Sequence, residues 1–139
     1  MDLLSSMRIS ATGLAAETTR MNTISSNIAN AETAGYKRKD PIFQAEADRE
    51  SFGEILKDRM DENAQGVLVS DIAEDTRPAK LVYRPHDHHA NAEGYVEMPN
   101  VSVVEETANM VAASRAYEAN IAAINTAKSM ALKALDIGK

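Results

Sequence analysis

The residues with the clearest capacity for chemistry are three histidines and an aspartate that lie close together in the sequence. They occur in the run Arg84-Pro85-His86-Asp87-His88-His89. Imidazole nitrogens and a carboxylate can bind zinc or nickel, but an ordered metal site also needs neighbouring groups that hold its ligands in place. Because the run lies between a proline and a polar segment, we expect a solvated loop; metal binding by His86–His89 is the weaker alternative.

Other catalytic patterns are weaker still. The acidic residues Asp48, Glu50 and Glu54 are spaced like a solvated face and do not suggest a carboxylate pair for acid–base catalysis. The sequence contains no glycine-rich phosphate loop, no HExxH motif and no nucleophile elbow. We therefore predict that the protein is not an enzyme and uses no cofactor.

Composition excludes several other classes of protein. A net charge of −6 argues against nucleic-acid binding, because affinity for phosphate requires clustered lysine and arginine. The absence of cysteine rules out disulfides and cysteine-ligated zinc. No apolar run approaches the ~20 residues of a membrane-spanning helix, and the N-terminus lacks the pattern of a secretory signal. We expect no lipid-embedded segment and no cleaved signal peptide.

The distribution of residues along the chain predicts three regions. All four prolines lie between positions 41 and 99, and five of the six aromatic residues lie between positions 36 and 95. Proline-free ends rich in alanine favour helices at 1–34 and 101–139, whereas the middle, 35–100, reads as β-rich. Within it we expect strands at 42–47, 67–72, 80–84 and 94–98, and a short helix at about 52–60. The predicted fold is mainly α, with a small β-rich insertion between two long helices that form an antiparallel, coiled-coil-like hairpin.

The N-terminal helix carries apolar and small residues in alternating steps of three and four, the spacing of a helix–helix seam. The predicted seam comprises Leu4, Met7, Ala11, Leu14, Thr18, Met21, Ser25 and Ile28. Asn27 and Asn30 are unusual so near its end, because asparagine favours caps and turns. We interpret them as ending the helix and hydrogen-bonding either the following loop or a neighbouring subunit. Gly35 is the expected C-terminal cap.

The C-terminal helix opens with a capping-box pattern at Ser102–Glu105, and Glu106 adds negative charge near the helix N-terminus. Its predicted seam comprises Val103, Met110, Ser114, Tyr117, Ile121, Ile124, Ala131 and Leu135. A second stripe, of alanines, lies nearly opposite at 100° per residue and comprises Ala108, Ala112, Ala116, Ala119, Ala123, Ala127 and Ala134.

The two helices also carry few charges, so both faces look buried, which one hairpin cannot achieve. We therefore predict an intersubunit face at Ala112, Ala116, Ala119 and Ala123. The alternative is that alanine fills surface positions as the best helix former.

Several motifs together resemble the bacterial flagellar axial proteins of the rod and hook. The N-terminal signature is Ser25–Asn30 (SSNIAN), Thr33 and Gly35–Arg38 (GYKR), and the segment 113–138 resembles the C-terminal helix of the same group. Between them, LVYRP, AEGYV and MPNV match the proximal-rod proteins in particular. Glu32 and Ala34 depart from the usual pattern. The signature residues on which we expect assembly to depend are Asn27, Asn30, Gly35, Tyr36, Tyr117 and Asn120.

The resemblance implies a non-catalytic building block. Such proteins leave the cytoplasm through the flagellar type III export apparatus and assemble, with copies of themselves and with other rod proteins, into the helical rod that crosses the periplasm. Phe52, Ile55 and Leu56 resemble the short segment recognised at the export gate; the alternative is that they form the buried face of the short helix. The rival function is a cytosolic helical adaptor or chaperone, which would have similar seams and no export.

Overall fold

The computed structural model describes residues 3–45 and 65–137. The predicted helix at 52–60, the carboxylates Asp48, Glu50 and Glu54, and the export-gate candidates Phe52, Ile55 and Leu56 lie outside these residues.

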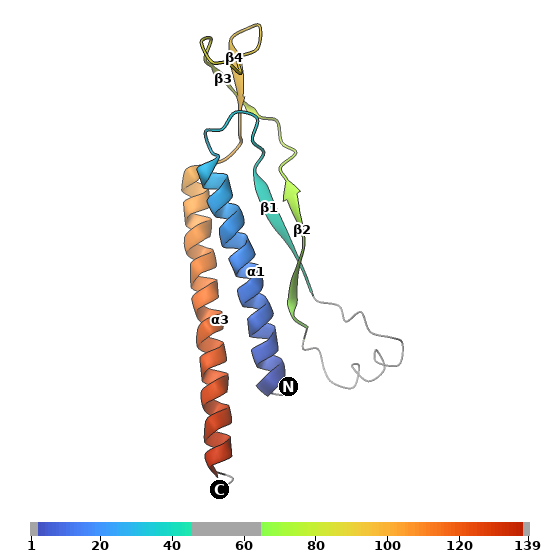
Figure 1. Ribbon diagram of the computed structural model, residues 1–139, viewed down its shortest axis with the longest axis vertical. Coiled ribbons are helices and arrows are strands. Elements are labelled where there is room, and N and C mark those ends of the chain that lie inside the picture. Colours follow the sequence, from blue (N-terminus) through green and yellow to red (C-terminus); the bar gives the residue numbers. More distant parts are fainter. Residues whose placement is uncertain (1–2, 46–64, 138–139) are drawn as a thin grey trace, which may run out of the picture.

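Two long helices dominate the molecule, as predicted. Helix α1 spans Leu3–Ala29 and helix α3 spans Val103–Ile137. They run side by side in opposite directions, so the two termini lie at the same end of the molecule, where α3 continues well past α1 (Figure 1). Their register follows from two contacts, because Asn27 hydrogen-bonds Glu106 and Gly13 lies against Asn120. The prediction of an antiparallel helical hairpin is confirmed.

The middle of the chain forms two separate antiparallel ribbons of two strands each. Strand β1 (Lys39–Ala45) pairs with β2 (Val67–Glu74), and β3 (Lys80–Tyr83) pairs with β4 (Tyr95–Met98). The β1–β2 ribbon runs beside α1, whereas β3 and β4 project beyond the end of the helices (Figure 1). The predicted strands agree closely with these bounds, except that β1 begins three residues earlier, at Lys39. The reason lies in the contacts of Asn27 described below.

Helix α1 ends at Ala29, five residues before the predicted boundary. Beyond it, the Ala31 N–H bonds to Ile28 O and the Thr33 N–H bonds to Asn30 O, so the chain continues in tight turns. Gly35 does have a positive φ of 75°, which favours glycine. It does not cap α1, however, because its N–H donates to Glu97 O in β4 at 3.1 Å. Its conformation serves the turn between α1 and β1, which is hydrogen-bonded to β4.

The seam predicted for α1 is only partly correct. Of its eight residues, four are half-buried and four are exposed (Leu4, Ala11, Thr18 and Ser25). The buried side chains of α1 are instead Ala16, Thr23, Ile24 and Asn27. A period of three and four shows which residues share a helix face, but it does not show which face a neighbour covers. Close approach at Gly13 and the buried amide of Asn27 turn a different face of α1 toward α3.

The seam predicted for α3 is partly correct. Met110, Tyr117, Ile124 and Ala131 are half-buried at intervals of seven, whereas Val103, Ile121 and Leu135 are exposed. The most buried residues of the helix are Glu106, Ala113 and Ala127, which were not assigned to the seam. Ala127 had been placed in the opposite alanine stripe, but that stripe turns gradually around a helix of 3.6 residues per turn and reaches the α1 side there.

Little apolar surface is buried by this arrangement. Among the residues that the structure describes, six apolar side chains are buried: Ala16, Ile24, Val96, Met98, Ala113 and Ala127. By contrast, sixteen large hydrophobic residues are exposed, of which seven lie on α3. Their number is high for a protein that stays monomeric, since contiguous exposed apolar surface usually marks an interaction site.

Two glycines with positive φ allow a test of the turns. An added Cβ at Gly35 would meet no atom within 4 Å, whereas at Gly94 (φ 83°) it would lie 2.9 Å from the Tyr83 ring and 3.3 Å from Pro85. Gly35→Ala should therefore lower the free energy of unfolding by about 1–2 kcal/mol through backbone strain alone. Gly94→Ala should lower it further because the ring must also move. Urea denaturation followed by tyrosine fluorescence measures both, and equal effects would contradict the packing at Gly94.

Candidate functional site: a buried polar junction

The side chain of Asn27, at the end of α1, is completely buried and makes four hydrogen bonds. Its Nδ2 donates to Lys39 O at 2.8 Å and to Glu106 Oε2 at 3.1 Å. Its Oδ1 accepts from the Lys39 N–H at 2.9 Å and from the Tyr36 hydroxyl at 3.0 Å. The amide thus uses both of its donors and both of its acceptor positions.

This pattern explains where β1 begins. By pairing with both the N–H and the C=O of Lys39, the Asn27 side chain imitates the backbone of a neighbouring strand. Lys39 is also the residue at which the ladder with β2 starts, opposite Glu74. A side chain near the end of a helix therefore sets the first residue of a strand that begins twelve residues later.

Glu106, in the first turns of α3, is the second member of the junction and is only 1% exposed. Its Oε1 accepts two hydrogen bonds from Arg38, from Nε at 2.9 Å and from Nη2 at 2.8 Å. Its Oε2 accepts the bond from Asn27. A carboxylate is also favoured near a helix N-terminus by the helix dipole.

Arg38 supplies the positive charge of the junction. Besides Glu106 it contacts Asp40 through Nη1, so one guanidinium bridges two carboxylates. Partial burial lowers the pKa of Arg38, but the hydrogen bond that Arg38 donates to Glu106 and the charges of Asp40 and Glu106 outweigh it and raise the pKa above the ordinary value. Arg38 is therefore charged in the folded chain at neutral pH. Removing one partner of a buried pair of this kind costs roughly 3–5 kcal/mol.

Sequence reasoning missed the roles of Glu106 and Arg38. Glu106 was interpreted as a charge near a helix terminus, and Arg38 only as part of the GYKR signature. A usable signal was present, because Glu106 is one of few charges on either helix. Its partners, however, are 68 and 79 residues away in the sequence, and local patterns do not report such distances.

The remaining signature residues lie in two places. Asn30 ends α1, with its Nδ2 donating to Ser26 O at 2.9 Å, and the Tyr36 hydroxyl is 3.3 Å from Ser26 Oγ. Gly35 lies in the same turn. Tyr117 and Asn120 are half-buried on α3, more than two turns from Glu106. Asn120 lies against Gly13, where an added Cβ would come within 3.0 Å of its Nδ2. The structure thus brings Asn27, Asn30, Gly35 and Tyr36 together, and Tyr117 and Asn120 belong to the helix interface.

The predicted alanine face lies on the flank of α3. Ala112, Ala119 and Ala123 are exposed and Ala116 is half-buried. The described residues thus leave three of the four alanines exposed, as an intersubunit surface would require.

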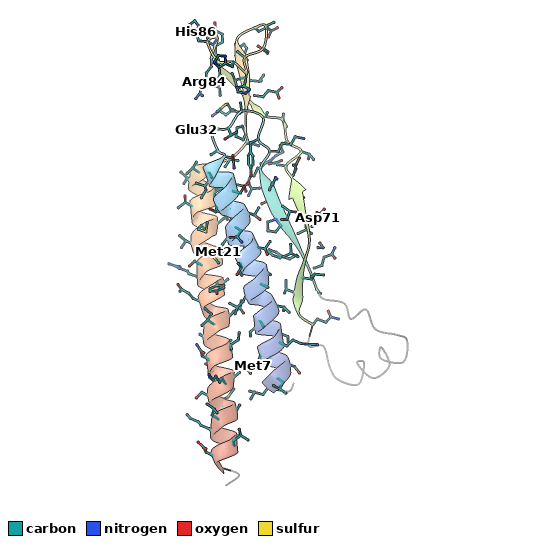
Figure 2. All side chains as sticks on the ribbon, in the orientation of Figure 1. Met7, Met21, Glu32, Asp71, Arg84 and His86 are labelled. Atoms are coloured by element: carbon teal, nitrogen blue, oxygen red, sulfur yellow. The ribbon has the colours of Figure 1, made fainter. Side chains whose placement is uncertain are left out.

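The histidine run forms an exposed loop between β3 and β4. Asp87 Oδ1 accepts from the His89 N–H at 3.0 Å and lies 3.2 Å from His89 Nδ1. Figure 2 shows His86 at the far end of this ribbon, away from the helices. In residues 3–45 and 65–137, no three histidine or acidic side chains gather as metal ligands would. In the same ranges, neither helix is long and apolar enough to cross a membrane.

The hydrogen bonds of the junction have a structural role. The polar atoms of Asn27 are all hydrogen-bonded to other parts of the chain, and those of Glu106 are engaged by Asn27 and Arg38. The arrangement fixes the relative positions of α1, α3 and the start of β1. Its function is to hold the two helices in one register.

Comparison with known proteins gives consistent matches. A family model described as "Flagella basal body rod protein" matches residues 7–37, and one described as "Flagellar basal body rod FlgEFG protein C-terminal" matches residues 92–137. The first range contains Asn27 and Tyr36, and the second contains Glu106. The two matched regions thus meet at the junction.

Three relatives match over nearly their whole length. The flagellar basal-body rod protein FlgC of Bacillus subtilis (strain 168) is 42% identical over 147 residues, covering 96% of this chain and 97% of that protein. FlgC of Salmonella typhimurium is 41% identical over 145 residues, with 100% of both chains covered. FlgC of Borreliella burgdorferi is 42% identical over 149 residues, covering 99% of this chain and 98% of that protein.

Replacement of Asn27 tests the junction directly. Asn27→Leu keeps a similar volume but leaves Lys39, Tyr36 and Glu106 with unpaired buried groups, each of which costs roughly 1–3 kcal/mol. We expect a loss of several kcal/mol in the free energy of unfolding, measured by urea denaturation with circular dichroism. Asn22→Leu, at an exposed position of the same helix, is the matched control and should change it by less than about 0.5 kcal/mol. Similar losses for the two variants would show that the junction does not hold the chain together.

Proposed function

Because the chain belongs to the family of flagellar basal-body rod proteins named FlgC, we propose that it is a structural subunit of the flagellar rod. The observation that carries this proposal is the combination of full-length relatives with two long helices, of which α3 exposes seven large hydrophobic side chains. A subunit of a polymer buries such faces against its neighbours. Membership of this family also supports a non-enzymatic role and a location in the basal body.

Its partners are other copies of the chain and other rod proteins. A long two-helix layer with unlike outer faces favours contacts in which one surface of a subunit meets a different surface of the next. Repetition of such heterologous contacts builds a filament when the rotation does not close. We further propose that the subunit is exported through the flagellar export apparatus and that the rod it forms crosses the periplasm.

The two rival functions lack a supporting observation. A cytosolic adaptor would have relatives of that class, and the relatives found here are rod proteins over their full length. A metal-binding role for His86–His89 receives no support from the exposed loop in which these residues lie.

Deletion of the gene in the bacterium that encodes it tests the proposed function. We expect basal bodies without a complete rod and cells without hooks when examined by electron microscopy, and we expect the plasmid-borne gene to restore both. Fractionation of the restored cells should recover the protein with basal bodies. Recovery in the cytoplasm alone, or intact rods in the deletion strain, would refute the proposal.

Substitutions in the alanine face test assembly without strongly destabilising the isolated chain. Ala119 and Ala123 are exposed, so Ala119→Glu with Ala123→Glu should alter the unfolding of the isolated chain by no more than about 1 kcal/mol in total. In the polymer, each glutamate would overpack a close contact, at roughly 1–3 kcal/mol, and would bury an unpaired carboxylate. We expect the protein to be made and exported at normal levels while rods and motility are lost.

Ile124→Glu is the control for the alanine face. Ile124 is half-buried on the α1 side of α3, so this change should destabilise the chain itself as well as the rod. Motile cells carrying the double glutamate variant would show that the alanine face is ordinary surface.

Export depends, in our proposal, on the segment that contains Phe52, Ile55 and Leu56. Its residues resemble the recognition segment of rod and hook subunits, and an unfolded chain presents them to the export gate. Phe52→Ser with Ile55→Ser should therefore trap the protein in the cytoplasm, as measured by immunoblotting of cytoplasmic and periplasmic fractions. Phe43→Ser, on the exposed side of β1, is the control and should leave export unchanged. Normal periplasmic levels of the double variant would leave the segment with a packing role only.

A further inference from the structure

The two edges of the β3–β4 ribbon differ in how their backbone groups are paired. In an antiparallel pair of strands, alternate residues bond across the ribbon, and the residues between them direct their N–H and C=O groups outward. The Arg84 N–H donates to Gly94 O at 2.9 Å, and the two strands keep one register from there to the end of the ribbon. It follows that Leu81 and Tyr83, one and three residues before Arg84, turn their backbone groups away from β4.

The outer edge of β4 is paired within the chain. The Tyr95 N–H donates to Asn91 Oδ1 at 2.9 Å, and the Asn91 N–H donates to Tyr95 O at 2.8 Å. The Gly35 N–H donates to Glu97 O at 3.1 Å. Three of the four outward backbone groups of Tyr95 and Glu97 therefore have partners, and the side chain and backbone of Asn91 take the place of a further strand.

The outer edge of β3 has no such cover. In the described part of the chain, none of the outward N–H and C=O groups of Leu81 and Tyr83 has a hydrogen-bond partner. The two side chains are 59% and 63% exposed. The Tyr83 ring lies against Gly94 and meets the Tyr95 ring edge to face, with 5.3 Å between the ring centroids. It therefore leans over β4 and leaves its own edge open, and an open edge is a template for another strand.

The position and length of this edge restrict what can bind to it. The ribbon projects beyond the end of the helices (Figure 1), and among the described helices and strands β3 contacts β4 alone. Pro78 precedes β3 and Pro85 follows it, and proline has no N–H to donate. The edge therefore accepts a short segment opposite Lys80–Arg84 and does not continue into a long sheet.

The side chains of β3 and of the residue after it specify the chemistry of an added strand. Lys80 and Arg84 are exposed and lie on one face of the strand, with Val82 between them. Leu81 and Tyr83 lie on the other face, because successive side chains of a strand alternate. Opposite charges that lie directly across from each other in neighbouring strands stabilise the pair. The strand that fits thus has an acidic residue at each end and apolar residues between.

We propose that the outer edge of β3 binds an extended segment of a partner protein, with the pattern acidic–apolar–apolar–apolar–acidic, as a third strand of the ribbon. Main-chain hydrogen bonds to Leu81 and Tyr83 hold the segment, as in other cases of strand addition. Carboxylates opposite Lys80 and Arg84 select it. The pattern is the same in both directions, so it suits a parallel or an antiparallel segment. This inference goes beyond the proposed function and does not depend on it.

A second copy of the chain does not fit this edge through its own β3. An antiparallel pair of β3 strands in which the outward groups of Leu81 meet those of Tyr83 places Lys80 of each copy opposite Arg84 of the other. A parallel pair also brings cations together. Like charges directly opposite each other are destabilising, and the outer edge of β4 is already paired. The occupant is therefore an acidic segment of a different protein.

Peptide binding to the full chain tests the site. The probe is fluorescein-Gly-Gly-Glu-Ile-Val-Ile-Glu-amide, and fluorescence anisotropy measures its dissociation constant. The matched control peptide is methylated on the backbone nitrogens of both isoleucines, which removes two donors without changing a side chain or a charge. We expect it to bind about tenfold more weakly, because the acceptors of the β3 edge then stay unpaired. The unmethylated peptide should also slow amide hydrogen exchange at Leu81 and Tyr83.

Two substitutions separate the backbone of β3 from its side chains. Leu81→Pro removes an outward N–H and leaves the ladder with β4 intact, because proline is tolerated where the N–H of an edge strand faces solvent. We expect it to weaken peptide binding by about tenfold. Leu81→Ala keeps the N–H and should weaken binding less. Slow amide exchange at Val82, which bonds to β4, verifies that the ribbon is folded in both variants.

Charge exchange provides a test that misfolding does not imitate. Lys80→Glu with Arg84→Glu should weaken binding of the acidic peptide by about tenfold and should create binding of fluorescein-Gly-Gly-Lys-Ile-Val-Ile-Lys-amide. The proposal is refuted if the acidic peptide does not bind the unmodified chain, if the methylated peptide binds equally well, or if the exchange leaves the peptide preference unchanged. Self-association of the chain that Leu81→Pro abolishes would assign the edge to a second copy and would likewise overturn the proposal.

Discussion

The side-chain amide of Asn27 joins three parts of the chain that are far apart in sequence. It contacts Lys39 at the start of β1, Tyr36 in the preceding turn and Glu106 in α3, and it is fully buried. Because every donor and acceptor of the amide is used, any shift of α1 along α3 would leave buried polar groups unpaired. Such groups cost far more than a satisfied bond contributes, so one register of the two helices is strongly preferred.

This constraint matters because the apolar core is small. The buried apolar residues of the helical pair are mainly alanines, with Ile24 as the largest, and an alanine interface tolerates sliding better than interlocked leucines do. The ion pair of Arg38 with Glu106 adds to the same end of the helices. Buried polar groups of this kind contribute little net stability and instead select one arrangement among several. The hydrogen bonds of the junction therefore fix the alignment of α1 along α3 more precisely than the apolar packing does.

The fixed register of α1 against α3 also determines the outer surface of the helical pair. The outer faces of α1 and α3 lie on different helices, so their relative height depends on how the helices are aligned, and the junction at one end of the pair determines that alignment. Any partner that contacts both helices therefore meets the two faces at fixed relative heights. The hydrogen bonds in the interior of the junction thus determine the relative positions of the outer surfaces of the two helices.

Much of this protein follows from the sequence alone. The positions of proline and of alternating apolar residues predicted both long helices, the β-rich middle and strand bounds close to those of β2, β3 and β4, because these signals act over a few residues. The low charge of the helices indicated neighbours, and the motifs around Asn27 and Tyr117 identified the family. These features are local, or depend on composition, and no folded structure is needed to read them.

Tertiary structure decided which faces are used. Periodicity grouped the half-buried Leu14 and Met21 on one side of α1 but added exposed residues such as Leu4, because α3 packs around Gly13 and Asn27. The end of α1, the purpose of Gly35 and the partnership of Glu106 with Arg38 were also beyond the sequence. The physical reason is that a helix presents the same periodic pattern whichever neighbour covers it. A buried amide or carboxylate finds its partners only when residues separated by 68 to 79 positions meet in the fold.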